Sequence, residues 1–219
     1  MTDLTRTSPP PEEGRSARKR RAIMEAATEL FLRNGYQGTS MDEVATLAAV
    51  SKQTVYKQFT DKEQLFSAII IGATERVGDF TDVVTEFAGT EDLEKDLGEL
   101  ARRYITAVIQ PRTLQLRRLL IAEAGRFPAV ARDYYQRAPG RTIDAFTETF
   151  RKLAGRGLLR IDDPSMAAGH FAWLILAQPM DKAMFFDEEL QHTPTDLQRF
   201  ADEGVRVFLA AYRTSASRS

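Results

Sequence analysis

Apolar residues recur every three or four positions along most of the chain, which is the spacing of amphipathic α-helices. Ile23, Ala27 and Phe31 belong to the first such stripe, and Gly35 provides a left-handed stop, so a helix is predicted over residues 18–34. No segment shows a convincing alternation of apolar and polar residues as a half-buried strand would. The pattern predicts an all-α protein.

Two short helices are predicted next, on either side of a tight turn. Ser40 can cap a helix that starts at residue 41, with Glu43 reaching back to complete a capping box. This helix is expected to end near residue 49, because Ser51 offers another N-cap and a third helix follows to residue 58. A short helix, a tight turn and a second short helix form the outline of a helix-turn-helix, which is a weak signal by itself.

The remaining pattern is helical to the end of the chain. Asp61, with Gln64 three residues later, predicts one long helix whose apolar stripe continues to Val84. Pro164 and Pro194 follow capping residues and open two late helices, the first of which Pro179 should kink or break. The other predicted helices cover residues 93–108, 113–125, 128–135 and 143–155.

Composition narrows the functional classes. The 219 residues are 43% hydrophobic and 28% charged, which fits a globular protein and neither a disordered nor a fibrous one. The chain has no cysteine and two histidines, so little material exists for a metal site or for histidine catalysis, and no metal or cofactor is expected. The net charge of -1 means that any nucleic-acid contact must come from a local patch.

The first residues differ from the rest. Residues 1–14 contain three consecutive prolines and no apolar run of the kind a signal peptide needs, so residues 1–16 are expected to form a disordered leader. No apolar stretch approaches the roughly 20 residues that cross a bilayer. We therefore expect a cytoplasmic protein with no membrane partner.

Residues 44–65 read VATLAAVSKQTVYKQFTDKEQL. This segment closely resembles the N-terminal signature of the TetR family of bacterial transcriptional regulators, and the resemblance extends over about residues 18–71. It includes the AVS turn, the TVY of the recognition helix, the aromatic Phe59 and the DKEQL start of the next helix. Ala49 and Gln53 depart from the family, which usually has a turn glycine at the first position and frequently glycine at the second. If the turn requires a positive φ, Ala49 costs roughly 1 kcal/mol of strain.

The resemblance implies a DNA interface on the second short helix. Lys52 and Gln53 lie at its N-terminal end, where Lys can donate to guanine and Gln can pair with adenine. Hydroxyl and ammonium groups nearby suit phosphate oxygens. The alternative is that Tyr56 and Phe59 only close a small core while the lysines are solvated. The candidate DNA-contacting residues are Ser40, Ser51, Lys52, Gln53, Thr54, Tyr56, Lys57 and Lys62.

Five positive charges fall within seven residues at the start of the first helix. They are Arg15, Arg18, Lys19, Arg20 and Arg21. Taken alone they read as a solvated helix turn. Beside a helix-turn-helix they could instead follow phosphates or a minor groove of the duplex.

The resemblance also implies a homodimer in which the last two helices pair with their counterparts. Both helices are rich in large apolar residues, which fits this reading and equally fits core helices of a monomer. A two-fold operator read by one helix-turn-helix per half-site favours two copies. Residues 116–135 are similar to the C-terminal domains of regulators akin to AcrR and AefR, although this likeness is less specific.

Family members are mostly repressors that a small molecule releases from DNA, so the resemblance implies a ligand pocket in the C-terminal domain. Aromatic residues interspersed with polar ones are consistent with a pocket, although aromatics at helical spacing more often form a core. The effector is expected to be small and apolar or amphipathic. The candidate ligand-binding residues are Tyr104, Glu123, Phe127, Phe146, Phe150, His170 and Trp173.

Two other functional classes fit less well. An enzyme would need a catalytic motif, and the one Glu-x-x-His match, Glu189 to His192, reads as a loop because a di-iron bundle needs two such motifs. A helical adaptor gives no reason for Lys52, Gln53 and Lys62 together. The expected protein is a sequence-specific regulator, most simply a repressor, with a leader over residues 1–16, a helix-turn-helix domain over 17–63 and a helical ligand-binding and dimerisation domain over 64–219.

Overall fold

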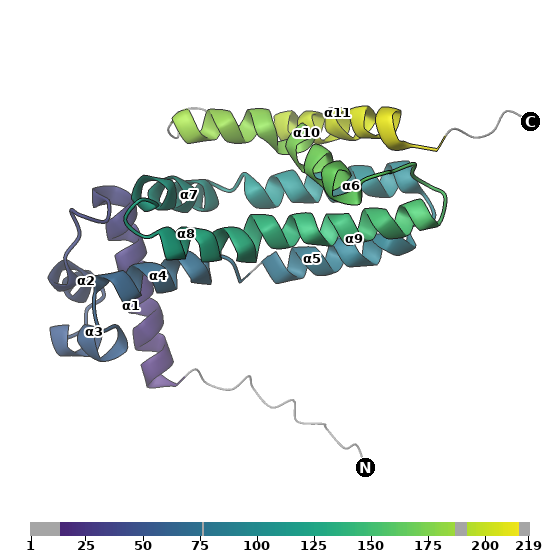
Figure 1. Ribbon diagram of the computed structural model, residues 1–219. Helices are drawn as coiled ribbons and strands as arrows, with labels where there is room; N and C mark the ends of the chain where they lie inside the picture. The colour runs from purple at the N-terminus through teal and green to yellow at the C-terminus, as the bar shows by residue number, and fades with distance from the viewer. Residues whose placement is uncertain (1–13, 76, 187–191, 215–219) are drawn as a thin grey trace, which may run out of the picture. The chain divides into compact units, whose positions relative to one another are not determined.

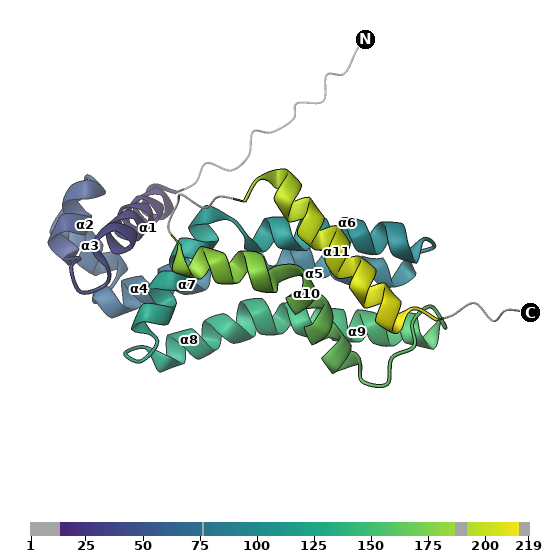
Figure 2. The ribbon, with the colours of Figure 1, turned by 90° about the horizontal axis from the view of Figure 1, so that it is seen from above.

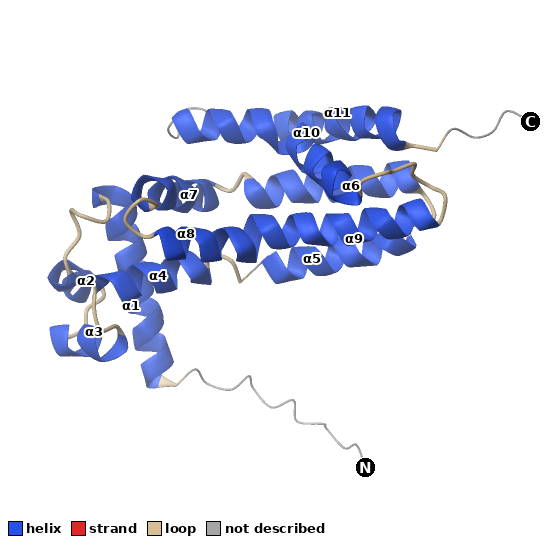
Figure 3. Ribbon diagram, in the orientation of Figure 1, coloured by secondary structure: helices blue, strands red, loops and turns tan. Residues whose placement is uncertain are grey.

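The computed structural model describes residues 14–75, 77–186 and 192–214, and its regular elements in this part of the chain are helices (Figure 3). One isolated β-bridge pairs Leu159 with Arg213. The all-α prediction is confirmed. The elements are α1 (Arg15–Asn34), α2 (Met41–Leu47), α3 (Lys52–Gln58), α4 (Lys62–Gly72), α5 (Val77–Glu86), η1 (Phe87–Gly89), α6 (Leu93–Val108), α7 (Pro111–Glu123), α8 (Pro128–Tyr135), η2 (Gln136–Gly140), α9 (Arg141–Gly155), α10 (Pro164–Phe185) and α11 (Pro194–Tyr212).

The chain divides into two compact units between Ile69 and Ile70, a point within α4 (Figure 1). The division expected from the sequence, between residues 63 and 64, falls in the first turn of α4. Of the leader expected over residues 1–16, positions 1–13 lie outside the described residues, and α1 begins at Arg15.

The first unit is built around the apolar faces of α1 to α4. Ile23 and Phe31 of α1, and Val55 of α3, are completely buried. The Phe31 ring packs against the Tyr36 ring at 5.8 Å and against the Phe66 ring at 5.6 Å between centroids. These ring contacts join α1 to α4. Helix α1 also packs against α2 and α3, and α2 packs against α3, so the helix-turn-helix is held on α1 by its buried apolar residues.

The turn between α2 and α3 requires a residue in the left-handed conformation. The Val50 amide donates to the Ala45 carbonyl and the Ala49 amide to the Thr46 carbonyl, which is the pattern of a Schellman motif. Ala49, at the position that usually carries glycine, has a φ of 51°. The turn therefore does require a positive φ, and Ala49 carries the strain of roughly 1 kcal/mol that was expected for this case.

Replacing Ala49 with glycine should raise the stability of the first unit by about 1 kcal/mol, because glycine occupies positive φ without a Cβ clash. Ala48 precedes it with an ordinary helical φ of -75° and provides the matched control. Ala48→Gly should lower stability by about 0.5–1 kcal/mol. Native-state hydrogen exchange of the α1 to α3 amides measures both changes, and stabilisation by both variants would contradict the strain argument.

The long helix predicted from Asp61 to Val84 is wrong. The chain leaves the helix after Gly72 and starts α5 at Val77. In between, the amides of Thr74 and Glu75 donate three residues back instead of four, and the Thr74 hydroxyl bonds the Ile71 carbonyl at 2.7 Å. Glycine and threonine are poor helix formers, and threonine bonds back to its own backbone, so they break the helix while the apolar stripe stays nearly in phase.

The two late prolines act as expected, one by opening a helix and the other by kinking one. Pro194 opens α11 behind Thr193, whose side chain forms a capping box with Asp196. Pro179 does not end α10, which continues to Phe185. The α10 ribbon bends instead (Figure 2), as expected where a proline removes a backbone donor inside a helix.

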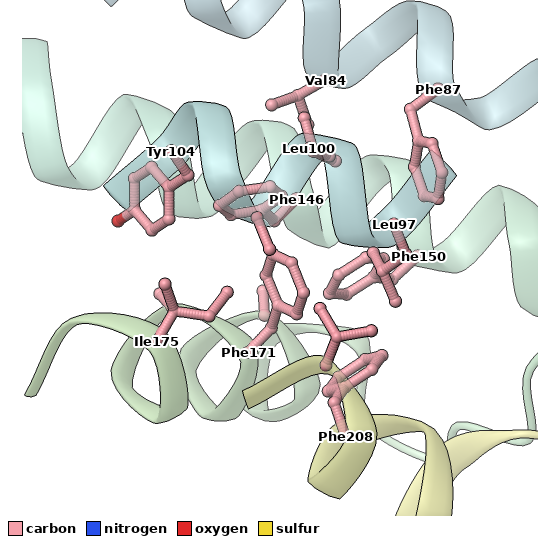
Figure 4. Packing of buried hydrophobic residues seen from close by; sticks show 14 of the residues in the cluster. Val84, Phe87, Leu97, Leu100, Tyr104, Phe146, Phe150, Phe171, Ile175 and Phe208 are labelled. Atoms are coloured by element: carbon pink, nitrogen blue, oxygen red, sulfur yellow. The ribbon is translucent and has the colours of Figure 1, made fainter. Parts of the chain in front are cut away.

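The second unit has one large apolar core. Helix α10 packs against α9 and α11, α11 packs against α6, and α5 packs against α9. Rings from α9, α10 and α11 meet at its centre (Figure 4), where Phe146, Phe150, Phe171 and Phe208 are all fully buried. Neighbouring rings among them lie 5.0 to 5.8 Å apart, distances at which aromatic pairs attract beyond simple burial.

Candidate DNA interface and ligand cavity

Helix α3 has a buried face and a polar exposed face. Val55 and the following Phe59 anchor it in the core of the first unit. The Ser51 hydroxyl caps its start by accepting the Thr54 amide at 3.2 Å. The exposed side chains include Lys52, Gln53, Tyr56 and Lys57, and Tyr56 is 45% exposed. A capped helix that presents donors and acceptors at its N-terminal end has the layout of a recognition helix.

Lys52 is held by a carboxylate in this structure. Its Nζ lies 2.8 Å from Oδ1 and 2.9 Å from Oδ2 of Asp42, the second residue of α2. The hydrogen bond to Asp42, together with its charge, raises the pKa of the Lys52 ammonium above the ordinary value. Both side chains are exposed, so the pair contributes little to stability. It does fix where the Lys52 charge is placed.

Three of the hydroxyl side chains predicted to contact DNA stabilise the first turns of α2 and α3. The Ser40 hydroxyl accepts the Glu43 amide at 3.2 Å, and the Glu43 carboxylate accepts the Ser40 amide at 2.8 Å. These bonds to Ser40 lower the pKa of Glu43. The hydroxyls of Ser51 and Thr54 lie 2.8 Å apart. Any phosphate that these groups contact would therefore meet the first turns of α2 and α3, where backbone amides also point outward.

Lys62 is directed inward. Its ammonium donates to the carbonyl oxygens of Tyr36 and Thr39, each at 2.8 Å, and lies 4.4 Å from the centre of the Tyr36 ring. These contacts join the start of α4 to the segment that leads from α1 into α2. No local pattern predicts this role, because the two carbonyls belong to residues more than twenty positions away from Lys62.

The basic run lies at the start of α1, beside the end of α3. The Arg20 guanidinium lies 4.3 Å from the centre of the Phe59 ring and donates to the Gln58 carbonyl at 3.4 Å. The Gln58 amide in turn donates to the Ser16 hydroxyl at 3.1 Å. Since α3 is the candidate recognition helix, the exposed positive charges of residues 15–21 adjoin the candidate interface.

Replacing Asp42 with asparagine is expected to raise affinity for duplex DNA of any sequence about fivefold at low salt. The change frees the Lys52 charge and removes a negative charge near the polyanion. Glu29→Gln is the control, because it removes an equally exposed carboxylate, paired at 3.7 Å with Arg33 on α1. Fluorescence anisotropy with random-sequence duplex measures the affinities. An equal gain in affinity in both variants would mean that the lower negative charge of the protein, and not the release of Lys52, causes the effect.

The second unit contains a cavity of about 640 Å³. The end of α4 and helices α5 to α10, including η2, supply its lining. Its apolar and aromatic lining includes Phe80, Tyr134, Leu116 and Leu176, and the Phe80 ring stacks on the Tyr104 ring at 5.3 Å. A volume of this size accommodates a small organic molecule.

Tyr104 is the one nominated ligand residue that lines this cavity. It is buried, and its hydroxyl points away from the Phe146 ring (Figure 4). Burial raises the pKa of the Tyr104 hydroxyl far above its ordinary value, while the Arg117 charge acts in the opposite direction. The hydroxyl therefore stays protonated and can donate a hydrogen bond.

The structure places the other nominated residues elsewhere. Phe146 and Phe150 belong to the core described above, and the side chain of Phe127 is buried outside the cavity lining. The remaining three do not line the cavity either. The Glu123 carboxylate lies 3.5 Å from Nε of Arg126, and Nδ1 of His170 is hydrogen-bonded to the Tyr212 hydroxyl at 2.6 Å. The Trp173 side chain is 55% exposed.

The cavity's polar lining was not nominated from the sequence. It includes Gln110, Arg112, Thr113, Arg117 and Thr142. The Arg117 guanidinium contacts the Met180 sulfur. Arginines on an amphipathic helix normally face water, so the α7 pattern held no signal that two of them border a cavity.

The Glu-x-x-His match of the sequence falls partly outside the described residues, since Glu189 is not among them. His192 precedes α11 and packs edge-on against the Phe200 ring. In the part of the chain that the structure describes, no group of three His, Asp or Glu side chains could hold a metal ion. No helix there is both long and apolar enough to cross a membrane.

Two family models match the chain. Residues 23–69 match the model of bacterial regulatory proteins of the TetR family, and residues 95–214 match the C-terminal domain of AefR-like transcriptional repressors. The two matches coincide with the helix-turn-helix unit and with most of the second unit.

Full-length relatives agree. The chain is 42% identical to a solved TetR-family regulator from Mesorhizobium loti MAFF303099, with a TM-score of 0.83 over 92% of this chain and 100% of the other. It is 30% identical to the structure of the flavonoid-responsive regulator FrrA, with a TM-score of 0.72 over 91% and 99% of the two chains. The uncharacterized HTH-type regulator YhgD of Bacillus subtilis is 29% identical, over 84% of this chain and 91% of its own. The chain therefore belongs to the TetR family, whose members are DNA-binding transcriptional regulators of the repressor type and not enzymes.

Proposed function

We propose that the protein is a homodimeric repressor that reads its operator with α3 and leaves DNA when a small amphipathic molecule fills the cavity of the second unit. The observation that carries the proposal is the exposed polar row at the capped start of α3, which includes Lys52 and Gln53. Side chains of these two types pair with guanine and adenine edges in the major groove. Lys52 and Gln53 are exposed, so packing in the core does not account for them, and base contacts do.

The proposed contacts divide into two kinds. Lys52 and Gln53 read bases, and the groups around them position the protein by binding phosphates. To contact a base, Lys52 must first break its ion pair with Asp42, and the free energy lost with that pair reduces the net affinity for the operator. The proposed phosphate contacts are Ser40, Ser51, Thr54, Tyr56, Lys57 and Lys62, with the basic run of residues 15–21 beside them.

Selection of bound sequences from random duplex DNA, at two salt concentrations, tests this function. A palindromic site recovered at both concentrations supports a dimeric, sequence-reading regulator. Gln53→Ala should then relax the preference at one base position, whereas Tyr56→Phe should weaken binding to all sequences alike. Recovery of no preferred site by folded, dimeric protein, with and without candidate effectors, would oppose the proposal.

The proposed dimer forms through α10 and α11. Their exposed apolar side chains include Met166, Trp173 and Leu174 on α10 and Val207 on α11. Large exposed apolar groups on neighbouring helices are typical of a protein contact surface. A two-fold dimer also supplies the two recognition helices that a palindromic operator needs.

Trp173→Arg is expected to produce a monomer and to lower operator affinity at least tenfold, because it places a charge in the proposed interface. Ile121→Arg is the matched control, since Ile121 of α7 is 62% exposed and lies outside the proposed interface. Sedimentation equilibrium gives the oligomeric state of both variants. A dimeric Trp173→Arg variant would place the interface elsewhere.

The proposed release mechanism uses α4. This helix starts in the helix-turn-helix unit, and Gly72 at its end lines the cavity. An effector acts only if it binds more tightly to the conformer that does not fit the operator. The aromatic lining and the similarity to a flavonoid-responsive regulator support an effector with an aromatic body.

Adding flavonoids and other small aromatic compounds to the protein–operator complex tests the release. An active compound should lower operator affinity and raise the thermal stability of the protein without DNA. Replacing Leu116 of the lining with tryptophan should fill part of the cavity and weaken both effects while operator binding persists. Release that is undiminished in this variant would oppose the cavity as the effector site.

A further inference from the structure

We propose that the effector of this protein is an anion, an amphipathic molecule whose single acidic group binds Arg117 while its apolar body occupies the rest of the cavity. This inference rests on the proposed function, because it assigns a chemical class to the molecule that the cavity takes. It follows from the charges around the cavity and from the partners of those charges.

The lining carries positive charge without negative charge. Arg112 and Arg117 both border the cavity, and none of its described lining residues is Asp or Glu. Both arginines belong to α7. The side chain of Arg112 is exposed, whereas that of Arg117 is half-buried. Since an arginine is charged at any physiological pH, the lining has a permanent positive potential.

Arg117 lacks a carboxylate partner in the described part of the chain. Its guanidinium contacts the thioether sulfur of Met180, a weak and neutral acceptor. Arg103 of α6 and Arg118 of α7, by contrast, have oxygen partners: Arg103 bonds Glu99, and Arg118 bonds the carbonyls of Ala183 and Phe186. A half-buried guanidinium without an anion is unusual, because desolvating a charge is unfavourable unless a partner compensates it.

The surroundings of Arg117 suit a carboxylate or a phenolate. A planar guanidinium can donate two parallel hydrogen bonds to a carboxylate. Tyr104, on which the Arg117 charge acts, keeps a protonated hydroxyl and adds a donor to the same anion. The rings of Phe80 and Tyr104 and the side chains of Leu116 and Leu176 would contact the apolar body.

Matched acid and amide pairs test the inference. Isothermal titration calorimetry of the full-length protein would use 2-naphthoate, 4-biphenylcarboxylate and dodecanoate, each beside its neutral primary amide. At least one acid should bind about tenfold or more tightly than its amide, and it should also release the operator. Arg117→Gln should remove this preference while leaving the amide's affinity within about threefold, and Arg117→Lys should restore part of it.

Arg132→Gln is the control, because Arg132 is exposed on α8 and is not part of the cavity lining. It should leave the preference for the acid unchanged. Equal binding of each acid and its amide would overturn the inference and leave the cavity as an effector site for neutral molecules. Loss of the preference in Arg112→Gln but not in Arg117→Gln would overturn the assignment to Arg117. Binding of no acid and no amide would overturn the inference, and the flavonoid experiment would then decide the proposed function separately.

Discussion

Replacing Phe146 with alanine is expected to lower the free energy of unfolding of the second unit by about 3–5 kcal/mol, the usual cost of removing a fully buried phenylalanine ring. Phe146 has no exposed surface, and its ring lies 5.0 Å from the Phe171 ring and 5.8 Å from the Phe150 ring. It also meets the Tyr104 ring edge-on at 5.3 Å (Figure 4). The helices around it cannot close the resulting void without losing these ring contacts.

Urea denaturation monitored by far-ultraviolet circular dichroism measures the loss, and Ile121→Ala provides the control. Ile121 is 62% exposed on α7 and lies outside the proposed dimer interface, so its removal should change the stability by less than about 0.5 kcal/mol. A loss below about 1.5 kcal/mol in Phe146→Ala would mean that the core around it relaxes and is not the rigid centre of the unit.

The Phe146 substitution should also change the cavity. Its ring supports Tyr104 and Phe80, which both line the cavity, and the two rings stack on each other. When the support is removed, both rings gain freedom, and an effector must pay the entropy of ordering them again. Weaker effector binding by a folded Phe146→Leu variant, with unchanged operator affinity, would show that the core positions the cavity wall.

Helix starts were the most predictable part of the fold. The sequence marks them with local groups, and Ser40 with Glu43 and Thr193 with Asp196 form the capping boxes that their spacing predicts. Helix ends inside an apolar stripe were less predictable. The break after Gly72 leaves the stripe from Leu65 to Val84 nearly in phase, so periodicity alone could not separate α4 from α5.

The cavity was the least predictable part of the site. Helical periodicity indicates which face of a helix is buried, but the distance between neighbouring helices decides whether a buried residue meets a neighbour or an empty space. Phe146 and Tyr104 therefore look alike in sequence. Both belong to the buried core, but of the two only Tyr104 also lines the cavity. Arg117 looks like a solvated residue of α7 until the other helices are placed around it.

Lys62 illustrates the same limit in the helix-turn-helix unit. Its position in the first turn of α4 predicts a phosphate contact, and this remains part of the proposed interface. The structure adds hydrogen bonds to two carbonyls that periodicity could not reveal, at Tyr36 and Thr39. These bonds hold the segment that ends at Ser40, where α2 begins, and so couple the ammonium to the placement of the helix-turn-helix.

Lys62→Ala is expected to lower the stability of the first unit by about 2–3 kcal/mol, because hydrogen bonds to a charged group contribute more than neutral ones and the ammonium also lies over an aromatic ring. Lys57→Ala is the matched control, since Lys57 is exposed at the end of α3. It should cost less than about 0.5 kcal/mol. Native-state hydrogen exchange of the α1 and α2 amides measures both variants.

The salt dependence of operator binding separates the two roles of Lys62. If the ammonium acts by holding the segment from Tyr36 to Thr39, Lys62→Ala weakens binding while the slope of log affinity against log salt stays the same. If it also binds a phosphate, the slope falls by about 1, as expected for the loss of one phosphate contact. Wild-type stability in the variant would contradict the structural role, because the carbonyls of Tyr36 and Thr39 would then have lost their shared donor at no cost.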